Sequence, residues 1–189
     1  MNIVGVILAG GKSTRMKQDK ALLKLKSESL LQQQFAMMED LLGEGRVVVS
    51  GDRPGFPHIT DISPGLGPLE GLRSVCHHLL NQSDERSLLV VPVDMPFINE
   101  DGLRRLILHE SESEVTKFSS HQLPALFCDL KRTITEIEFL MSEAQTTSSR
   151  DCSFKKLFNR LKVDDLEMNE SDKFFTNLNT PEDFHAALS

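Results

Sequence analysis

The chain has 189 residues, of which 39% are hydrophobic and 26% charged, and its formal net charge is −7. This length suits one α/β domain with a full core, so we expect residues 1–189 to form a single domain. The acidic balance argues against a general nucleic-acid-binding protein, because such proteins usually need a basic surface. No apolar run approaches the roughly 18 residues of a membrane span, and no basic residue precedes the apolar stretch 3–9 as in a signal peptide.

The three cysteines, Cys76, Cys128 and Cys152, are widely spaced and form no CxxC pair. This pattern argues against a disulfide framework and against a zinc site. It is typical of a protein that works in a reducing compartment. We therefore predict free thiols and a cytoplasmic protein.

The first half of the chain alternates short apolar runs with helical repeats of apolar residues. The runs are rich in β-branched residues, as in strands buried on both faces, and the repeats have three- and four-residue spacing. Asn99 is a natural N-cap for the last of these helices. In chain order we predict strand 3–8, helix 30–42, strand 46–50, helix 69–80, strand 87–93 and helix 99–110.

The second half is less regular. A strand is predicted at 123–128, and helices at 129–143 and 153–161. A final helix begins after Thr180, a natural N-cap, with Pro181 at its first position. The alternation of elements predicts an α/β fold of three layers with a mostly parallel sheet, and ligands of such sheets sit beyond the carboxyl ends of the strands.

A glycine turn follows the first predicted strand. The chain has L-A-G-G-K-S-T-R-M from residue 8 and D-K-A-L-L from residue 19. Gly10 and Gly11 let backbone N–H groups approach a phosphate, Arg15 supplies a forked donor, and Lys20 supplies a mobile positive charge. The string is neither the P-loop nor the dinucleotide fingerprint, and a glycine pair alone often marks only a tight turn. Six basic residues and one acid between positions 12 and 26 favour an anionic ligand.

The third predicted strand ends in P-V-D-M-P at 92–96. An aspartate directly after a buried apolar run is costly unless something pairs with it. Asp94 is therefore either a ligand for Mg²⁺, which prefers hard oxygen atoms, or a side chain that caps the turn before Pro96.

The strings at 8–23 and 92–96 resemble the signatures of the sugar-phosphate and cofactor nucleotidyltransferases, and most of all those of the molybdenum cofactor guanylyltransferase (MobA) family. The segments G-L-G-P-L-E-G at 65–71 and N-L-N-T-P-E-D at 177–183 resemble further motifs of that family. The resemblance implies a three-layer, Rossmann-like nucleotidyltransferase fold. It also implies transfer of GMP from Mg²⁺-bound GTP to the terminal phosphate of molybdenum-molybdopterin, which yields the guanine dinucleotide cofactor and pyrophosphate.

The resemblance also implies roles for individual residues. Catalysis falls to Lys20, Asp94 and Arg15, with Asp94 as the metal ligand. Arg150, Asn177 and Asn179 would approach the second substrate. Ser50 stands where the family often has an asparagine. The nucleotide-binding set is Leu8, Ala9, Gly10, Gly11, Lys20, Ser50, Asp61, Gly67 and Asp94.

The implied partners are GTP, a molybdopterin-type cofactor and, transiently, cofactor-biosynthesis enzymes or molybdoenzymes, but neither nucleic acid nor a membrane. Two alternatives remain open. The chain could be a cytidylyl- or uridylyltransferase of the same fold that acts on another cofactor or on a sugar or polyol phosphate; the N-T-P-E-D motif and the short length count against this. It could also be a non-catalytic nucleotide-binding module, against which the intact Lys20 and Asp94 count.

Overall fold

The computed structural model describes residues 2–10, 19–25, 27–81, 86–146, 152–168, 173–178, 180 and 182–184. These residues form a seven-stranded sheet in the order β5-β4-β1-β6-β8-β7-β9, together with a two-stranded sheet of β2 and β3. In the large sheet β8 is antiparallel to both neighbours, and the other pairings are parallel. The strands are β1 (Ile3–Leu8), β2 (Lys24–Leu25), β3 (Glu28–Ser29), β4 (Val47–Ser50), β5 (His58–Ile59), β6 (Ser87–Pro92), β7 (Val115–Phe118), β8 (Ala125–Phe127) and β9 (Val163–Leu166).

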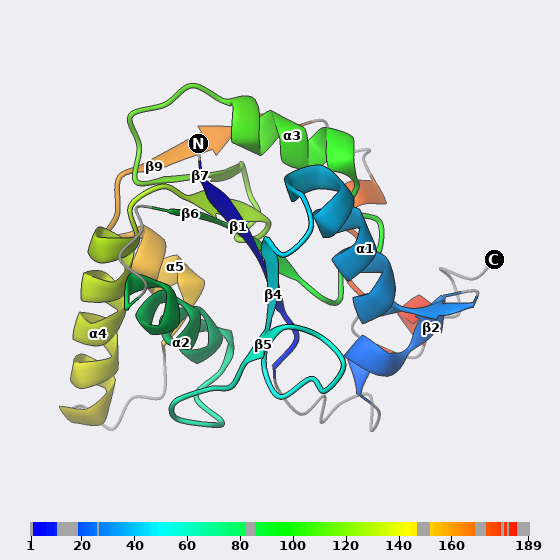
Figure 1. Cartoon of the computed structure of the whole chain (residues 1–189). Coiled ribbons are helices and arrows are strands. Elements are labelled where there is room, and N and C mark those ends of the chain that lie inside the picture. The colour runs from blue at the N-terminus through cyan, green and yellow to red at the C-terminus, as the bar shows by residue number, and fades with distance from the viewer. Residues whose placement is uncertain are drawn as a thin grey trace.

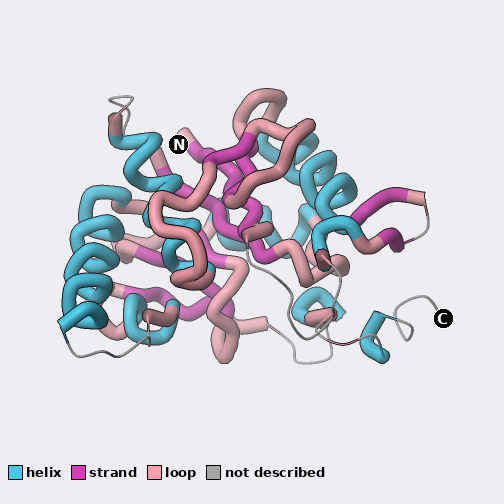
Figure 2. Tube along the Cα trace, turned by 90° about the horizontal axis from the view of Figure 1, so that it is seen from below, coloured by secondary structure: helices cyan, strands magenta, loops and turns pink. Residues whose placement is uncertain are grey.

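Helices cover both faces of the large sheet, which confirms the predicted three layers (Figures 1 and 2). On one face lie α1 (Leu30–Leu42) and α3 (Glu100–Leu108); on the other lie α2 (Pro68–Leu80), α4 (Leu130–Thr146) and α5 (Phe154–Phe158). There are also two short 3-10 helices, η1 (Lys20–Leu22) and η2 (Lys173–Phe175).

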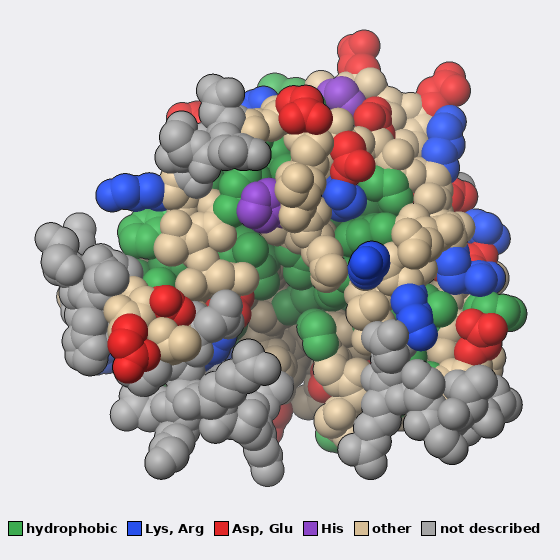
Figure 3. All heavy atoms as spheres, turned by 180° about the vertical axis from the view of Figure 1, so that it is seen from behind, with side chains coloured by type: hydrophobic (Ala, Val, Ile, Leu, Met, Phe, Trp, Pro, Cys, Tyr) green, Lys and Arg blue, Asp and Glu red, His purple; other side chains and the backbone are tan. Residues whose placement is uncertain are grey.

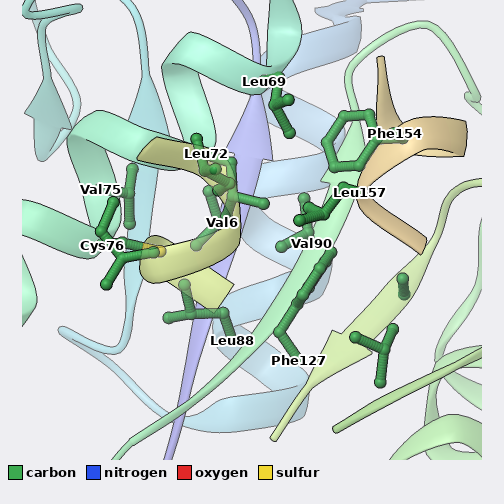
Figure 4. Packing of buried hydrophobic residues seen from close by; sticks show 14 of the residues in the cluster. Val6, Leu69, Leu72, Val75, Cys76, Leu88, Val90, Phe127, Phe154 and Leu157 are labelled. Atoms are coloured by element: carbon green, nitrogen blue, oxygen red, sulfur yellow. The ribbon is translucent and has the colours of Figure 1, made fainter. Parts of the chain in front are cut away.

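The core is divided by the sheet into two apolar clusters. All six residues of β1 are buried, so this strand contributes side chains to both clusters. Figure 4 shows the cluster on the α2 side, where Val6, Val90 and Phe127 of the sheet pack against Leu72 of α2 and Leu157 of α5. In the same cluster, burial raises the pKa of the Cys76 thiol to about 12, so this thiol stays protonated.

Side-chain caps fix where several helices begin. Ser29 and Gln32 form a reciprocal capping box at α1. Asn99 caps α3 as predicted, because its side chain accepts a hydrogen bond from Gly102 N at 3.0 Å. Thr180 Oγ1 likewise accepts from Asp183 N at 3.1 Å, and residues 182–184 are helical. Pro181 lies outside the described residues.

Two differences from the predicted elements have physical causes. The segment predicted as helix 153–161 forms only Phe154–Phe158, because the chain turns at Asn159 to enter β9. Strands β7 and β9 were not predicted. The sequence of β9 is V-D-D-L, which lacks an apolar run because this strand pairs on one side only, at the edge of the sheet.

The strand order explains where a ligand site belongs. After β1 the chain moves to β4 on one side, and it later returns to β6 on the other. The carboxyl ends of β1 and β6 therefore flank the point at which the sheet order reverses, which is where open α/β sheets bind ligands. No helix in the described part of the chain is long and apolar enough to cross a bilayer.

Candidate nucleotide and metal site

The ends of β1 and β6 lie side by side. Leu8 is in register with Pro92, and Val93 N donates to Leu8 O at 3.2 Å. Parallel pairing thus brings the residue after β1, Ala9, close to Asp94. The segment predicted to bind phosphate therefore starts at the same edge of the sheet as Asp94, the predicted metal ligand.

Lys20 and Asp94 form an ion pair across this edge. Lys20 Nζ donates to Asp94 Oδ2 at 2.9 Å, and the two side chains are only 15% and 23% exposed. The sequence indicated that an aspartate after a buried strand needs a partner, and in the ligand-free structure Lys20 supplies the charge that compensates this carboxylate.

Asn177 holds Asp94 from a third segment. With its amide nitrogen turned toward the carboxylate, Asn177 donates to Oδ1 at 2.7 Å and to the Asp94 carbonyl at 3.1 Å. The next residue, Leu178, donates its N–H to the same carbonyl at 2.8 Å. The structure therefore brings Lys20, Asp94 and Asn177 together. Arg15, Arg150 and Asn179 lie outside the described residues.

The Asp94 carboxylate suits Mg²⁺ that arrives with a triphosphate. Mg²⁺ in such sites is typically bound by one or two carboxylates and completes its shell with substrate oxygens and water. Within the described ranges, no three His, Cys, Asp or Glu side chains cluster in a way that could hold a metal ion. A single carboxylate such as that of Asp94 is the kind of protein ligand that a Mg²⁺ ion bound to a triphosphate needs.

Some backbone groups in the turn after β1 already have hydrogen-bond partners within the protein. Ala9 N donates to Ser50 O at 3.1 Å, and Ala9 O accepts from Arg53. Gly10 makes no backbone hydrogen bond to another described residue, and a Cβ at Gly10 would make only ordinary contacts, 3.7 Å from Ser50 O. The described residues around Gly10 therefore do not require glycine at this position, whereas close approach of a ligand would. Gly11 lies outside the described residues.

Asp61 faces the same turn with an unsatisfied oxygen. Its Oδ1 is buried without a hydrogen-bond partner among the described groups, and its carboxylate lies near Gly10 and Gly71. Burial, and secondly the charge of Glu70, raise the pKa of the Asp61 carboxyl above its usual value of 3.8. A buried polar atom without a partner needs an explanation, and an unfilled ligand contact is one.

Helix α2 holds the Asp61 loop in place. Ile62 N donates to Ser74 Oγ at 2.9 Å, and Ser63 N donates to Glu70 Oε1 at 2.8 Å. Glu70 is fully buried and pairs with Arg73 at 3.0 Å. The role of Glu70 was not predicted, although the residue stands in the G-L-G-P-L-E-G segment at 65–71 and in the first turn of a helix. Gly67, predicted to bind nucleotide, is the N-cap of α2, with φ +89° and no side-chain cap.

Ser50 lies under this loop, 1% exposed, with its hydroxyl directed at Gly71. Glycine to alanine in a helix usually stabilises by about 0.5–1 kcal/mol. Here a Cβ on Gly71 would lie 2.2 Å from Ser50 Oγ. We expect Gly71→Ala to lower the free energy of unfolding by about 1–3 kcal/mol, as overpacking does. Urea denaturation followed by circular dichroism measures this.

The matched control is Ser50→Ala combined with Gly71→Ala. It removes the clashing oxygen and leaves the Ser50 Cβ at 3.4 Å, so stability should recover. A single Gly71→Ala variant as stable as the wild type would contradict the close contact.

Comparison with known proteins identifies the family. The family model described as MobA-like NTP transferase domain matches residues 5–150. A molybdenum cofactor guanylyltransferase from Xanthomonas euvesicatoria is 41% identical over 180 residues, covering 94% of this chain and 90% of that protein. A probable molybdenum cofactor guanylyltransferase from Pelotomaculum thermopropionicum is 29% identical, covering 97% and 90%.

Solved structures agree on the fold. Molybdopterin-guanine dinucleotide biosynthesis protein A from Archaeoglobus fulgidus has a TM-score of 0.72 at 19% identity and covers 99% of this chain and 96% of that one. A 2-C-methyl-D-erythritol 4-phosphate cytidylyltransferase from Francisella tularensis has a TM-score of 0.71 at 14% identity, with coverage of 99% and 98%. The fold is thus shared by a molybdopterin-guanine dinucleotide biosynthesis protein and a cytidylyltransferase, and the sequence match identifies the family: the chain belongs to the MobA-like NTP transferase family and is a nucleotidyltransferase.

Proposed function

We propose that this nucleotidyltransferase transfers GMP from GTP to the terminal phosphate of molybdenum-molybdopterin, giving the guanine dinucleotide cofactor and pyrophosphate. The names of its relatives support the acceptor and the guanine nucleotide. The observation in this chain that carries the choice of base is the Asp61 carboxylate, whose Oδ1 is buried and lacks a partner.

A carboxylate that only accepts hydrogen bonds selects a base with adjacent donors. Guanine offers N1–H and an N2 amine side by side. Adenine and cytosine offer one amine next to a ring nitrogen that accepts, and uracil offers one N–H between two carbonyls. The Asp61 carboxylate, which lies beside the Gly10 backbone, therefore favours guanine over the other three bases.

The chemistry needs no protein nucleophile. An oxygen of the acceptor's terminal phosphate attacks the α-phosphorus of GTP, the new P–O bond forms in line, and the bond to pyrophosphate breaks. Mg²⁺ at Asp94, when bound, would neutralise triphosphate oxygens. Lys20, preorganised by its contact with Asp94, stabilises charge on the phosphates during transfer. We assign Arg15 a similar role on the triphosphate.

We assign the acceptor to a cavity of about 320 Å³ beside β7 and β9, which lie beyond β6 and β8 in the sheet order; its wall includes Lys117, His121 and Lys155. His121 stacks on Phe175 at 3.7 Å between ring centroids, and Phe175 lies two residues before Asn177. Lys and Arg side chains also gather beside an apolar hollow on the face seen in Figure 3. This surface suits a heterocyclic, anionic acceptor. Arg150, Asn177 and Asn179 stay proposed contacts of the second substrate, and of these only Asn177 lies within the described residues.

Competition between nucleotides tests the proposal. We expect kcat/KM for GTP to exceed that for ATP, CTP and UTP when pyrophosphate release is measured with Mg²⁺ and molybdenum-molybdopterin. Preference for CTP would move the protein to a cytidylyltransferase role. Binding of a triphosphate without pyrophosphate release would instead favour a non-catalytic nucleotide-binding module.

Asp61→Asn gives the sharper prediction on the base. The amide loses one acceptor and gains a donor, so kcat/KM for GTP should fall by roughly 5- to 150-fold, the 1–3 kcal/mol of a bidentate base contact. Xanthosine triphosphate, which has a carbonyl in place of the N2 amine, should become the better substrate of the variant. A fall for GTP without any gain for xanthosine triphosphate would contradict direct reading of the base by Asp61.

The same variant has an expected effect on stability. Because the pKa of Asp61 is higher in the folded protein than in the unfolded chain, the folded state loses stability as pH rises through this range. At pH 7 the ligand-free Asp61→Asn protein should therefore have a higher free energy of unfolding than the wild type. Urea denaturation at pH 7 and again near pH 4 measures the difference, which should shrink at the lower pH.

A further inference from the structure

Arg53 joins two parts of the candidate site that are ten positions apart in the sequence. Its Nε donates to the Ala9 carbonyl at 3.2 Å, and its Nη2 donates to Asp19 Oδ1 at 3.1 Å. Nη1 pairs with Asp19 Oδ2, which completes a forked contact with both carboxylate oxygens. The Arg53 side chain is only 14% exposed, so the contact is largely shielded from water.

The chain after β4 is shaped to bring Arg53 there. Gly51 has φ +116°, and a Cβ on it would lie 3.0 Å from Gly10 Cα. Both the positive φ and this close approach require glycine at position 51. The turn at Gly51 thus lies directly against the turn after β1, with Arg53 two residues further on.

Asp19 links Arg53 to Lys20 along the chain. Asp19 caps η1, because its Oδ1 also accepts from Ala21 N at 3.0 Å. Lys20 is the first residue of η1 and pairs with Asp94. Arg53 thus ties the Ala9 carbonyl to Asp19, and Asp19 is followed directly in the chain by Lys20, which pairs with Asp94.

We propose that Arg53 is a positioning residue for nucleotidyl transfer, which holds Asp19 and the Ala9 carbonyl so that Lys20 and the Gly10 backbone meet the triphosphate in a fixed geometry. The motif residues of the phosphate-binding segment are Arg15 and Lys20, and no motif in the sequence pointed to Arg53. Arginine suits the task because its planar fork reaches a carboxylate and a carbonyl at once, whereas lysine offers a single point of charge.

The expected effect is on nucleotide use. In Arg53→Ala, kcat/KM for the triphosphate should fall by roughly 30- to 100-fold, since a misplacement of about 1 Å can cost 10²-fold. The KM for the acceptor should stay within twofold. Arg53→Lys should recover only part of the loss. Arg46→Ala is the matched control, because Arg46 is exposed at the opposite end of β4 and should behave as wild type.

A double-mutant cycle on nucleotide binding tests whether Arg53 acts through Lys20. The chain has no tryptophan or tyrosine, so binding of a fluorescent GTP analogue can be followed with little protein background. Arg53→Ala should weaken binding at least tenfold in the wild-type background but less than threefold in a Lys20→Ala background. Equal effects in both backgrounds, or wild-type affinity in Arg53→Ala, would overturn the proposal.

A substitute variant and a change of nucleotide keep the proposal testable. If Arg53→Ala does not fold, Asp19→Asn replaces it in the same cycle, because it removes the carboxylate through which Arg53 acts. The inference rests on the proposed function only for the choice of GTP as probe. A wild-type protein that binds another triphosphate would refute that choice, and the cycle would then be run with the triphosphate that binds.

Discussion

Asp94→Asn is expected to abolish Mg²⁺-dependent turnover while the protein still folds. The variant keeps the shape of the side chain but removes the negative charge that pairs with Lys20 and that suits Mg²⁺. The Asn177 amide would then face a neutral group in place of a carboxylate. Pyrophosphate release measured across a range of Mg²⁺ concentrations should show no recovery at high Mg²⁺.

The same variant has an expected effect on stability. Asp94 is paired with Lys20, and its side chain is only 23% exposed. Breaking this partly buried pair should lower the free energy of unfolding by about 1–2 kcal/mol. Asp101→Asn, an exposed carboxylate in the first turn of α3, is the control and should leave both turnover and stability unchanged. If Asp94→Asn turned over with unchanged dependence on Mg²⁺, Asp94 would not be the metal ligand.

The parts of the fold that could be predicted were those with a local pattern. Strands β1, β4 and β6 are short apolar runs buried on both faces, and α1, α2 and α3 repeat apolar residues with helical spacing. Strand β9 has no such pattern, since an edge strand exposes part of its surface to water. Local periodicity in the sequence predicts strands and helices that are buried, and it gives no signal for a strand that is only partly buried.

The same distinction applies to the site. Lys20 and Asp94 could be named because each stands in a motif, but their contact spans 74 positions and no local feature predicts it. Arg53 and Glu70 were missed for a related reason. Their partners are Asp19 and the backbone at Ser63, and these contacts depend on how the loops pack, which neither a motif nor a charged residue in the sequence specifies.

The closing prediction concerns Lys20→Ala, for which we expect kcat to fall by about 10²–10³, the usual loss for one preorganised electrostatic donor. Because Lys20 occupies Asp94 Oδ2 in the ligand-free protein, its removal leaves that oxygen more accessible to Mg²⁺. The Mg²⁺ concentration for half-maximal rate should therefore not rise in Lys20→Ala, whereas in Asp94→Asn no Mg²⁺ concentration should restore turnover.

Lys24→Ala is the matched control, because Lys24 is exposed on β2 four residues further on, and its kcat should stay within twofold of wild type. Steady-state pyrophosphate release at saturating GTP, repeated at several Mg²⁺ concentrations, separates the two effects. A Lys20→Ala kcat within a few-fold of wild type would mean that Lys20 serves only to neutralise Asp94 in the absence of ligand. The charge stabilisation during transfer would then have to come from residues other than Lys20.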